Sequence, residues 1–392
     1  MKKKVLLLLL LLLSVVIIAL VASYFLLWGN SVYAKKAFSL TIDFEGERYL
    51  HALYLGEANG NHYFTMMTAN ETDNQKRTTH LIGMSSQASL LFHTTIEDGR
   101  TFSARMMSER IYITAIEAIG EEAIPITQIY DLAGNLVDSM PAPKGAAEYF
   151  MLDDEVFVVR HDAVHNYSFD STIWSLDQQK AIHLGSGGMV RNVHTLPDGT
   201  AIVFYNAGHY GNDEIFHDLG LVIYRISRET VLWEIAVPEV WYYGAGSSPH
   251  AVIGKNIVFG TIGHGEMNGP AYIVDFDGNL TEADGFVQGV QSFNDDYFYQ
   301  QRAYFSDDDC IEILLLHFKR VRRGENDDDR YRDFLLRLDQ NGGFLSRKHL
   351  KFSDGRNILW ISRDGEGNKR YFAVHPNEGS ADFEIFIETI SL

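Results

Sequence analysis

One short pattern recurs along most of the chain and constrains its fold more than any other feature. Each copy is an apolar strand, then Asp or Ser, then two or three turn residues that often include Gly, then a second apolar strand. The copies are centred on Ser85, Asp131, Asp177, Ser227, Asp275, Asp339 and, as a final half copy, Glu388. Successive copies lie 46, 46, 50, 48, 64 and 49 residues apart. A hairpin that returns at such regular intervals predicts a repeat architecture.

The period matches one four-stranded blade of a β-propeller, which takes about 40 to 50 residues. The intervals also contain candidates for the two strands that precede each hairpin, and these segments show no helical period with caps. Examples are RIYITAIEAI from Arg110, TAIVFYNAGH from Thr200 and YFYQQRAYF from Tyr297. The sequence therefore predicts an all-β fold, a seven-bladed β-propeller over residues 35–392.

Two parts of the repeat are irregular. The 64-residue interval contains the polar segment from Lys319 to Asp333, which we expect to be a long, solvated hairpin extension. The last copy reaches Leu392 with no room for the strand that should follow its turn. Because an unpaired sheet edge invites aggregation, we expect AFSLTIDF, Ala37 to Phe44, to supply the missing strand and close the ring.

The N-terminal region, residues 1–34, predicts a membrane anchor. Lys2, Lys3 and Lys4 precede an uncharged run of 24 residues from Val5 to Trp28. As a helix this run spans roughly 36 Å, enough to cross a bilayer core of about 30 Å. The lysines favour a cytoplasmic N-terminus with the propeller outside. The alternative is a signal peptide that is cleaved near Ala34, which would leave a secreted protein.

Charge and cysteine content narrow the function classes. The net charge is −19, and since the first 34 residues carry only three lysines, residues 35–392 carry −22. Such a surface repels phosphate backbones, so no nucleic-acid partner is predicted. Cys310 is the only cysteine, so packing and strand pairing must hold the domain without a disulfide.

The repeats resemble the quinoprotein-like and Trp-Asp-repeat group of β-propellers. The segment RISRETVLWEI, Arg225 to Ile235, is similar to the quinoprotein-like repeat of a strand, an Asp, a Thr-Gly turn and a Leu-Trp strand. Ser227 replaces the Asp here, and Val231 replaces the Gly. The resemblance implies a propeller over most of the chain. It implies no quinone site and no catalytic residue.

The clearest candidate metal ligands follow one repeat turn. In DFDGN and the residues after it, oxygen ligands stand close together, as in a calcium loop: Asp275, Asp277 and Asp284. The favoured interpretation is an ordinary hairpin turn, because Asp131 to Asn135 repeats the turn without the later acidic residues. No cofactor is predicted, and Ca or Zn remains the alternative.

Histidines and aromatics in the middle blades form the second candidate group. Six histidines lie there at strand ends or loops, including His161, His165 and His250. Loops at corresponding ends of successive blades converge near a propeller's central channel, where imidazoles and carboxylates can meet as metal ligands or as an acid–base pair. The aromatics can stack on a sugar or peptide, or staple blades together. The candidate binding residues are His209, Asp213, Glu214, His217, Trp241, Tyr242, His264 and Glu266.

No recognisable catalytic motif accompanies these residues. There is no GxSxG elbow, phosphate loop, dinucleotide fingerprint, HExxH or CxxC pair. The favoured interpretation of the histidines is therefore that they are hydrogen-bonded or exposed. The sequence favours a membrane-anchored, extracytoplasmic module that binds a protein or glycan partner without catalysis. The alternative is a metal-assisted hydrolase or lyase with a His/Asp/Glu site at the channel mouth, and quinoprotein oxidation ranks last.

Overall fold

The computed structural model describes residues 31–389, with gaps. The gaps are residues 74–75, 88, 97–99, 120–121, 144, 166–167, 177–179, 185–186, 211–215, 243–249, 264–268, 292–296, 308–309, 320–330, 353–355 and 365. The predicted anchor, Val5 to Trp28, lies outside the described residues. Within the described part, no helix has the length and apolar character needed to cross a membrane.

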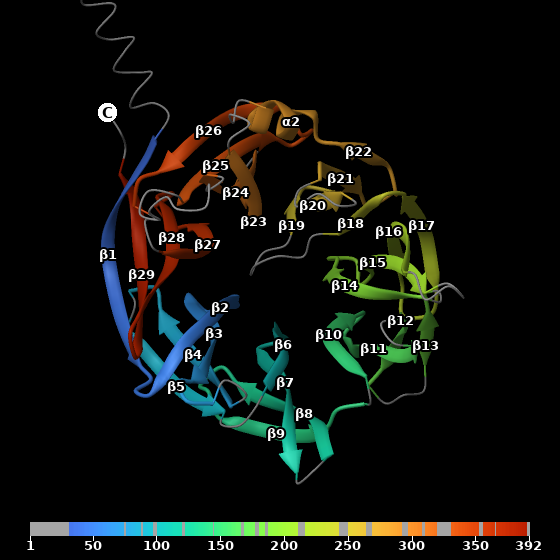
Figure 1. Cartoon of the computed structure of the whole chain (residues 1–392), viewed down its shortest axis with the longest axis horizontal. Coiled ribbons are helices and arrows are strands. Elements are labelled where there is room, and N and C mark those ends of the chain that lie inside the picture. The colour runs from blue at the N-terminus through green and yellow to red at the C-terminus, as the bar shows by residue number, and fades with distance from the viewer. Residues whose placement is uncertain are drawn as a thin grey trace, which may run out of the picture.

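The strands form sheets that stand around a common axis, each running from the middle of the ring to its outside (Figure 1). Four sheets have four antiparallel strands in chain order, as expected for propeller blades. The first two are β2 (Glu47–Ala58), β3 (Asn61–Asn70), β4 (Arg77–Ser85) and β5 (Leu90–Ile96), then β6 (Arg100–Met107), β7 (Arg110–Ile119), β8 (Glu122–Asp131) and β9 (Leu136–Pro141). The next two are β10 (Ala146–Leu152), β11 (Glu155–His165), β12 (Ser168–Ser175) and β13 (Ala181–His183), then β14 (Gly188–Thr195), β15 (Ala201–Tyr210), β16 (Phe216–Ile226) and β17 (Val231–Val237).

The remaining strands form a five-stranded and an eight-stranded sheet. In the five-stranded sheet two short inner strands both pair with β20: its members are β18 (Val240–Tyr242), β19 (His250–Ile253), β20 (Asn256–Gly263), β21 (Ala271–Asp275) and β22 (Leu280–Glu282). The eight-stranded sheet contains β23 (Tyr297–Asp307), β24 (Cys310–Lys319), β25 (Tyr331–Asp339), β26 (Phe344–Leu350), β27 (Asn357–Arg363), β28 (Lys369–Asn377), β29 (Ser380–Thr389) and β1 (Ser31–Asp43).

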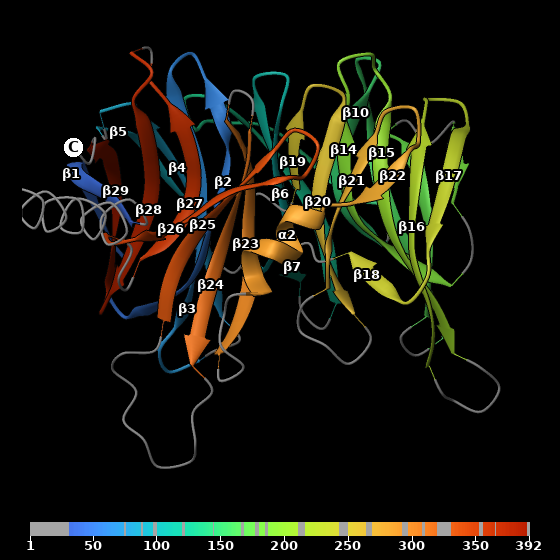
Figure 2. The ribbon, with the colours of Figure 1, turned by 90° about the horizontal axis from the view of Figure 1, so that it is seen from above.

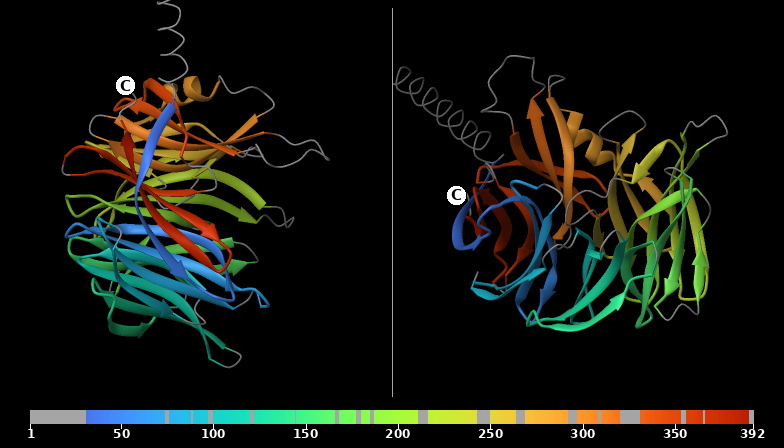
Figure 3. Two further views of the ribbon diagram at one scale, coloured as in Figure 1. Left: turned by 90° about the vertical axis from the view of Figure 1, so that its left-hand side faces the viewer. Right: turned by 60° about the horizontal axis from the view of Figure 1, so that its bottom comes forward.

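Strand β1 closes the ring, as the sequence predicts. It pairs antiparallel with β29 from Tyr33 opposite Thr389 to Asp43 opposite Ser380, and it lies on the outside of the ring (Figure 3). Ser31 and Val32 also pair in parallel with the end of β26, which joins the two halves of the eight-stranded sheet. Lys36 Nζ lies 2.9 Å from Glu384 Oε1 and ties the closing strand to its neighbour.

The recurrent hairpins are confirmed, and local turn chemistry explains them. In the β8–β9 turn, Asp131 Oδ1 accepts hydrogen bonds from the backbone N–H of Ala133 and Asn135, and Gly134 has φ = 80°. The same bonds recur around Asp275, Asp339 and Asp364. Aspartate favours such turns because its side chain caps the backbone two residues on, and glycine adopts positive φ at little cost.

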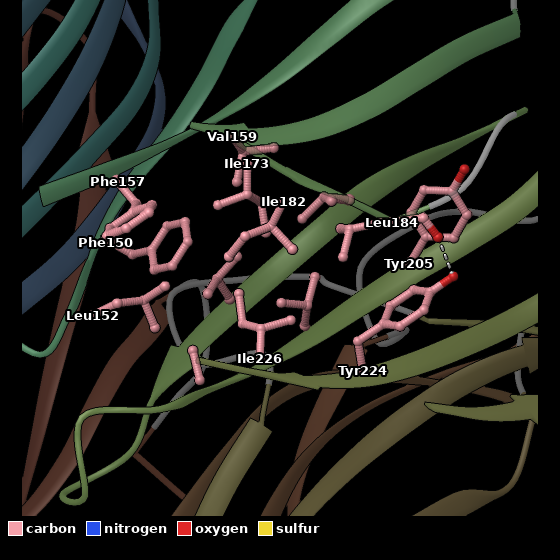
Figure 4. Packing of buried hydrophobic residues seen from close by; sticks show 14 of the residues in the cluster. Phe150, Leu152, Phe157, Val159, Ile173, Ile182, Leu184, Tyr205, Tyr224 and Ile226 are labelled. Atoms are coloured by element: carbon pink, nitrogen blue, oxygen red, sulfur yellow. Dashed lines mark hydrogen bonds between the residues drawn. The ribbon is translucent and has the colours of Figure 1, made fainter. Parts of the chain in front are cut away.

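Apolar side chains pack between neighbouring sheets. Between β10–β13 and β14–β17, buried residues from both sheets interdigitate, and Tyr224 Oη donates a hydrogen bond to Leu184 O at 2.6 Å (Figure 4). On the next pair of sheets, Trp233 of the quinoprotein-like segment donates through Nε1 to Phe276 O at 3.2 Å. These side-chain contacts join neighbouring blades, and a backbone hydrogen bond from Asp153 N to Gly199 O at 3.1 Å adds to them between β10–β13 and β14–β17.

One helix departs from the expected all-β chain between the sheets. Helix α2 (Asp284–Gln291) follows β22 and packs against β25 and β26 (Figure 2). It accounts for part of the length of the 64-residue interval that the sequence assigned to a hairpin extension alone. The expected extension joins β24 to β25, and residues 320–330 of it lie outside the described residues.

Candidate functional site

The first candidate site is a group of polar side chains on strands that include β6, β10, β14 and β19, which lie toward the middle of the ring (Figure 1). We call Arg105, Glu148, His194, His250 and Tyr242 the axial cluster; they come from β6, β10, β14, β19 and β18. Arg105 forms an ion pair with Glu148 and donates from Nη2 to Val193 O at 2.7 Å. One guanidinium thus links three successive sheets.

The histidines of the axial cluster bond to each other. His250 Nε2 lies 2.8 Å from His194 Nδ1, and Tyr242 Oη lies 3.3 Å from His250 Nδ1. The Tyr242 ring is 3% exposed and stacks on Phe204 with ring centroids 4.3 Å apart. The described contacts therefore indicate that the axial cluster holds neighbouring blades together.

Burial sets the protonation states in the axial cluster. It lowers the pKa of His194 to about 4, and Arg105 nearby acts in the same direction. It also lowers the pKa of His250 well below its usual value, with His194 and Arg105 contributing. Burial raises the pKa of Glu148, while Arg105 opposes that shift. Both histidines are therefore neutral near pH 7, which matches a hydrogen bond between two rings.

A second site, the seam pocket, lies where the ring closes between β1 and β2–β5. It is a cavity of about 280 Å³. Phe44, Glu47, Thr78 and His80 line it with buried or half-buried side chains. Glu45, Asn70, Lys76 and Thr95 complete the lining, and all but Asn70 are exposed.

Two threonines orient the carboxylate of Glu47. Thr78 Oγ1 donates to Glu47 Oε1 at 2.5 Å, and Thr68 Oγ1 donates to Glu47 Oε2. Although burial raises the pKa of Glu47, these hydrogen bonds and nearby His80 outweigh it and leave the pKa lowered. The Glu47 side chain is 22% exposed, so an anion fixed on both oxygens stands at the edge of the cavity.

A directed chain of hydrogen bonds links this anion to the outer strand. Because the Thr68 hydroxyl donates to Glu47, it accepts from His80 Nε2, which lies 3.0 Å away. His80 Nδ1 is then an acceptor for His93 Nε2 at 2.9 Å. Burial, with His93 nearby, lowers the pKa of His80 to about 4 although Glu47 opposes this, so a neutral His80 fits the order. His93 is exposed on β5.

Part of the predicted histidine group lies outside the described residues. This applies to Asp213, Glu214, His264 and Glu266. The backbones of His209 and His217 face each other across the β15–β16 pair, as a hairpin requires. Of the other candidates, Trp241 is half-buried and Tyr242 belongs to the axial cluster. The expected convergence of His209, His217, His264 and Glu266 therefore stays a prediction.

The structure places the predicted calcium ligands on two different elements. Asp275 Oδ1 accepts turn hydrogen bonds from Asp277 N and Asn279 N, and its Oδ2 accepts from Asn279 Nδ2 at 2.7 Å. Asp277 is exposed in this turn, whereas Asp284 begins α2. In the described part of the chain, no three His, Cys, Asp or Glu side chains are grouped to hold a metal ion.

Several residues of both sites were missed by sequence reasoning. Arg105, Glu148 and His194 stand on strands of different blades, and no spacing links them. His80 and His93 belong to the first recurrent hairpin, whose two strands are directly paired. Pairing the residues across the two strands of that hairpin would have indicated that His80 and His93 lie close together.

Comparison with known proteins finds solved structures that are similar to this chain, but it identifies no family. No family model matches the chain, and a search of curated proteins finds no match. BamB from Moraxella catarrhalis is 10% identical with a TM-score of 0.42, covering 92% of this chain and 99% of that one. The β-propeller domain of the Trilobed protease from Pyrococcus furiosus is 11% identical with a TM-score of 0.48, covering 89% and 95%. A DUF4221 family member from Bacteroides vulgatus is 10% identical with a TM-score of 0.45, covering 92% and 99%.

Proposed function

We propose that the protein is a membrane-anchored, extracytoplasmic, seven-bladed propeller that binds a protein or glycan partner without catalysing a reaction. The count of seven treats β23–β26 as one blade and β27–β29 with β1 as another, because only two residues of β1 pair with β26. The rigid ring then serves to hold a binding surface in place.

The seam pocket is the observation that carries this proposal. It combines a cavity with an oriented carboxylate that no Lys or Arg neutralises among the described residues. The described hydrogen bonds of the axial histidines are made within their own cluster. A cavity with unneutralised charge is suited to a partner, whereas a self-bonded pair is suited to holding blades together.

The anchor proposal rests on the N-terminal sequence. Lys2 to Lys4 followed by the apolar run Val5 to Trp28 favours insertion with the propeller outside. The test is a reporter enzyme, active only outside the cytoplasm, fused after Leu392. We expect activity in membrane fractions. Activity in the medium would support cleavage near Ala34 instead, and an inactive fusion of normal abundance would contradict export.

The binding proposal is tested with the full-length protein in detergent on glycan and peptide arrays. We expect saturable binding to one class of probe, reduced at least tenfold in Glu47→Gln. Glu366→Gln, on the exposed β27–β28 turn, is the matched control and should bind normally. Absence of binding to both arrays would count against the module. Stoichiometric Zn or Ca in the purified protein, with a melting temperature that falls after chelation, would favour the metalloenzyme instead.

A further inference from the structure

The size of the seam pocket limits what can occupy it. Its volume of about 280 Å³ is at the lower limit of the roughly 300–1,000 Å³ that is usual for small-molecule sites. A single side chain or a ligand of similar size would therefore fill it. Phe44 supplies an apolar wall, and the other lining side chains are polar.

The charge of the seam pocket further limits the kind of ligand that can bind there. Glu47 and Glu45 are its acidic groups, and Lys76 is its one basic lining residue. Lys76 is exposed, and no ion pair joins it to either glutamate among the described residues. The groups that hydrogen-bond Glu47 are hydroxyls, and His80 behind them is neutral. The pocket thus keeps a net negative charge that only an incoming cation can neutralise.

We propose that the seam pocket binds a basic side chain, a guanidinium or ammonium group, of a polypeptide partner, with Glu47 as its counter-ion. This deepens the proposed function and rests on it. Both oxygens of Glu47 are already oriented by threonines, so little reorganisation is needed when the cation arrives. A guanidinium can pack against Phe44 while it donates to the carboxylate.

Two further observations favour a polypeptide over a sugar. Strand β5, which contributes Thr95 to the pocket, is the edge of its sheet, and its first residues Leu90 and Leu91 are 44% and 47% exposed. An extended segment can lie along such an edge and cover these leucines. The charge of −22 on residues 35–392 also attracts basic chains before contact.

The test uses calorimetric titration of the full-length protein in detergent. The probes are Nα-acetyl-arginine methylamide and its uncharged counterpart Nα-acetyl-citrulline methylamide, with methyl glycosides and CaCl₂ or ZnCl₂ alone as alternatives. We expect the arginine probe to bind at least tenfold more tightly than citrulline, and more weakly at high salt. Glu47→Gln should remove this preference, whereas Glu366→Gln should keep it.

A second variant guards against misfolding of the first. Thr95→Trp fills the pocket from an exposed position and leaves Glu47 intact, so it should also block the arginine probe while the melting temperature stays normal. Equal binding of citrulline, or Glu47-dependent binding of a glycoside or a metal ion alone, would overturn the proposal. If array partners still bind and neither variant affects them, the pocket proposal fails and the binding module stands; if nothing binds, both fail.

Discussion

The axial cluster contains two histidines that bond to each other, and His80 of the seam pocket bonds to His93 on β5, yet the two hydrogen-bond chains end at different groups. In the axial cluster, His194 and His250 lie 2.8 Å apart and the chain continues to the buried hydroxyl of Tyr242. At the seam pocket, the lining residue His80 lies 2.9 Å from His93 outside the pocket, and the chain of hydrogen bonds continues from His80 through Thr68 to the Glu47 carboxylate at the edge of the cavity. The histidine pair is therefore not what distinguishes a binding site here.

The two sites differ in whether the charge of their carboxylate is neutralised within the protein. The axial carboxylate, Glu148, is paired with Arg105 inside the ring, so its charge is neutralised within the protein. The seam carboxylate, Glu47, is held by hydroxyls and stays anionic. Burying a paired charge ties elements together, whereas presenting an oriented anion invites a ligand.

The largest expected effect is on the pH dependence of stability, where the two pairs should act alike. His80 and His194 both have a pKa of about 4 in the folded protein, against about 6.5 when unfolded. Between these values the unfolded chain binds more protons, so stability is complete above pH 6.5 and falls as the pH drops toward 4. We expect a loss of several kcal/mol in urea unfolding, at about 1.4 kcal/mol per pKa unit.

His80→Phe and His194→Phe should each flatten this profile by a similar amount. Lowered carboxyl pKa values, such as that of Glu384, act only below about pH 4.5, and the raised pKa of Glu148 acts in the opposite direction, so a loss of stability between pH 6.5 and 4.5 reports the histidines. A profile that is flat in this window for the parent protein would show that the histidines are charged in the fold.

Removing one charged side chain from each site should lower the free energy of unfolding by different amounts. Arg105→Met leaves Glu148 without its partner and Val193 O without its donor, so we expect the free energy of unfolding to fall by about 3 kcal/mol. Lys76→Met, in the seam pocket, removes an exposed cation that has no ion pair among the described residues. This variant should change the free energy of unfolding by less than about 0.5 kcal/mol. Equal losses in urea titrations of the two variants would erase the distinction.

The fold was predictable because its information is local. Each recurrent turn begins at an Asp or a Ser, and those at Asp131, Asp275 and Asp339 also carry a Gly with positive φ, so the hairpins follow from segments of about ten residues. The closing strand was predictable for a different reason: the last repeat lacked a partner, and the first apolar segment could supply it. Helix α2 was missed because its eight residues, DGFVQGVQ, include two glycines and carry little helical signal.

The candidate sites were less predictable because they depend on register between blades. The sequence singled out Tyr242 and His250, and both lie in the axial cluster, but their partners come from other sheets. His194 is 56 residues from His250, and Arg105 is 43 residues from Glu148. Glu47 reaches His80 only after β2, β3 and β4 have paired. No periodicity in one blade specifies how it meets the next.

The smallest expected difference is between replacements of one histidine in each pair. His250→Phe keeps the ring packing on Phe204 but leaves His194 and Tyr242 without these hydrogen bonds inside the ring, so we expect a loss of about 2 kcal/mol. After His80→Phe, Thr68 still donates to Glu47 and exposed His93 can bond to water, so the loss should be about 1 kcal/mol. The free energies of unfolding should be measured at pH 7.5, where both histidines are neutral, so that protonation does not contribute to the difference between the two variants. A larger loss for His80→Phe would mean that the seam chain, rather than the axial cluster, holds the ring together.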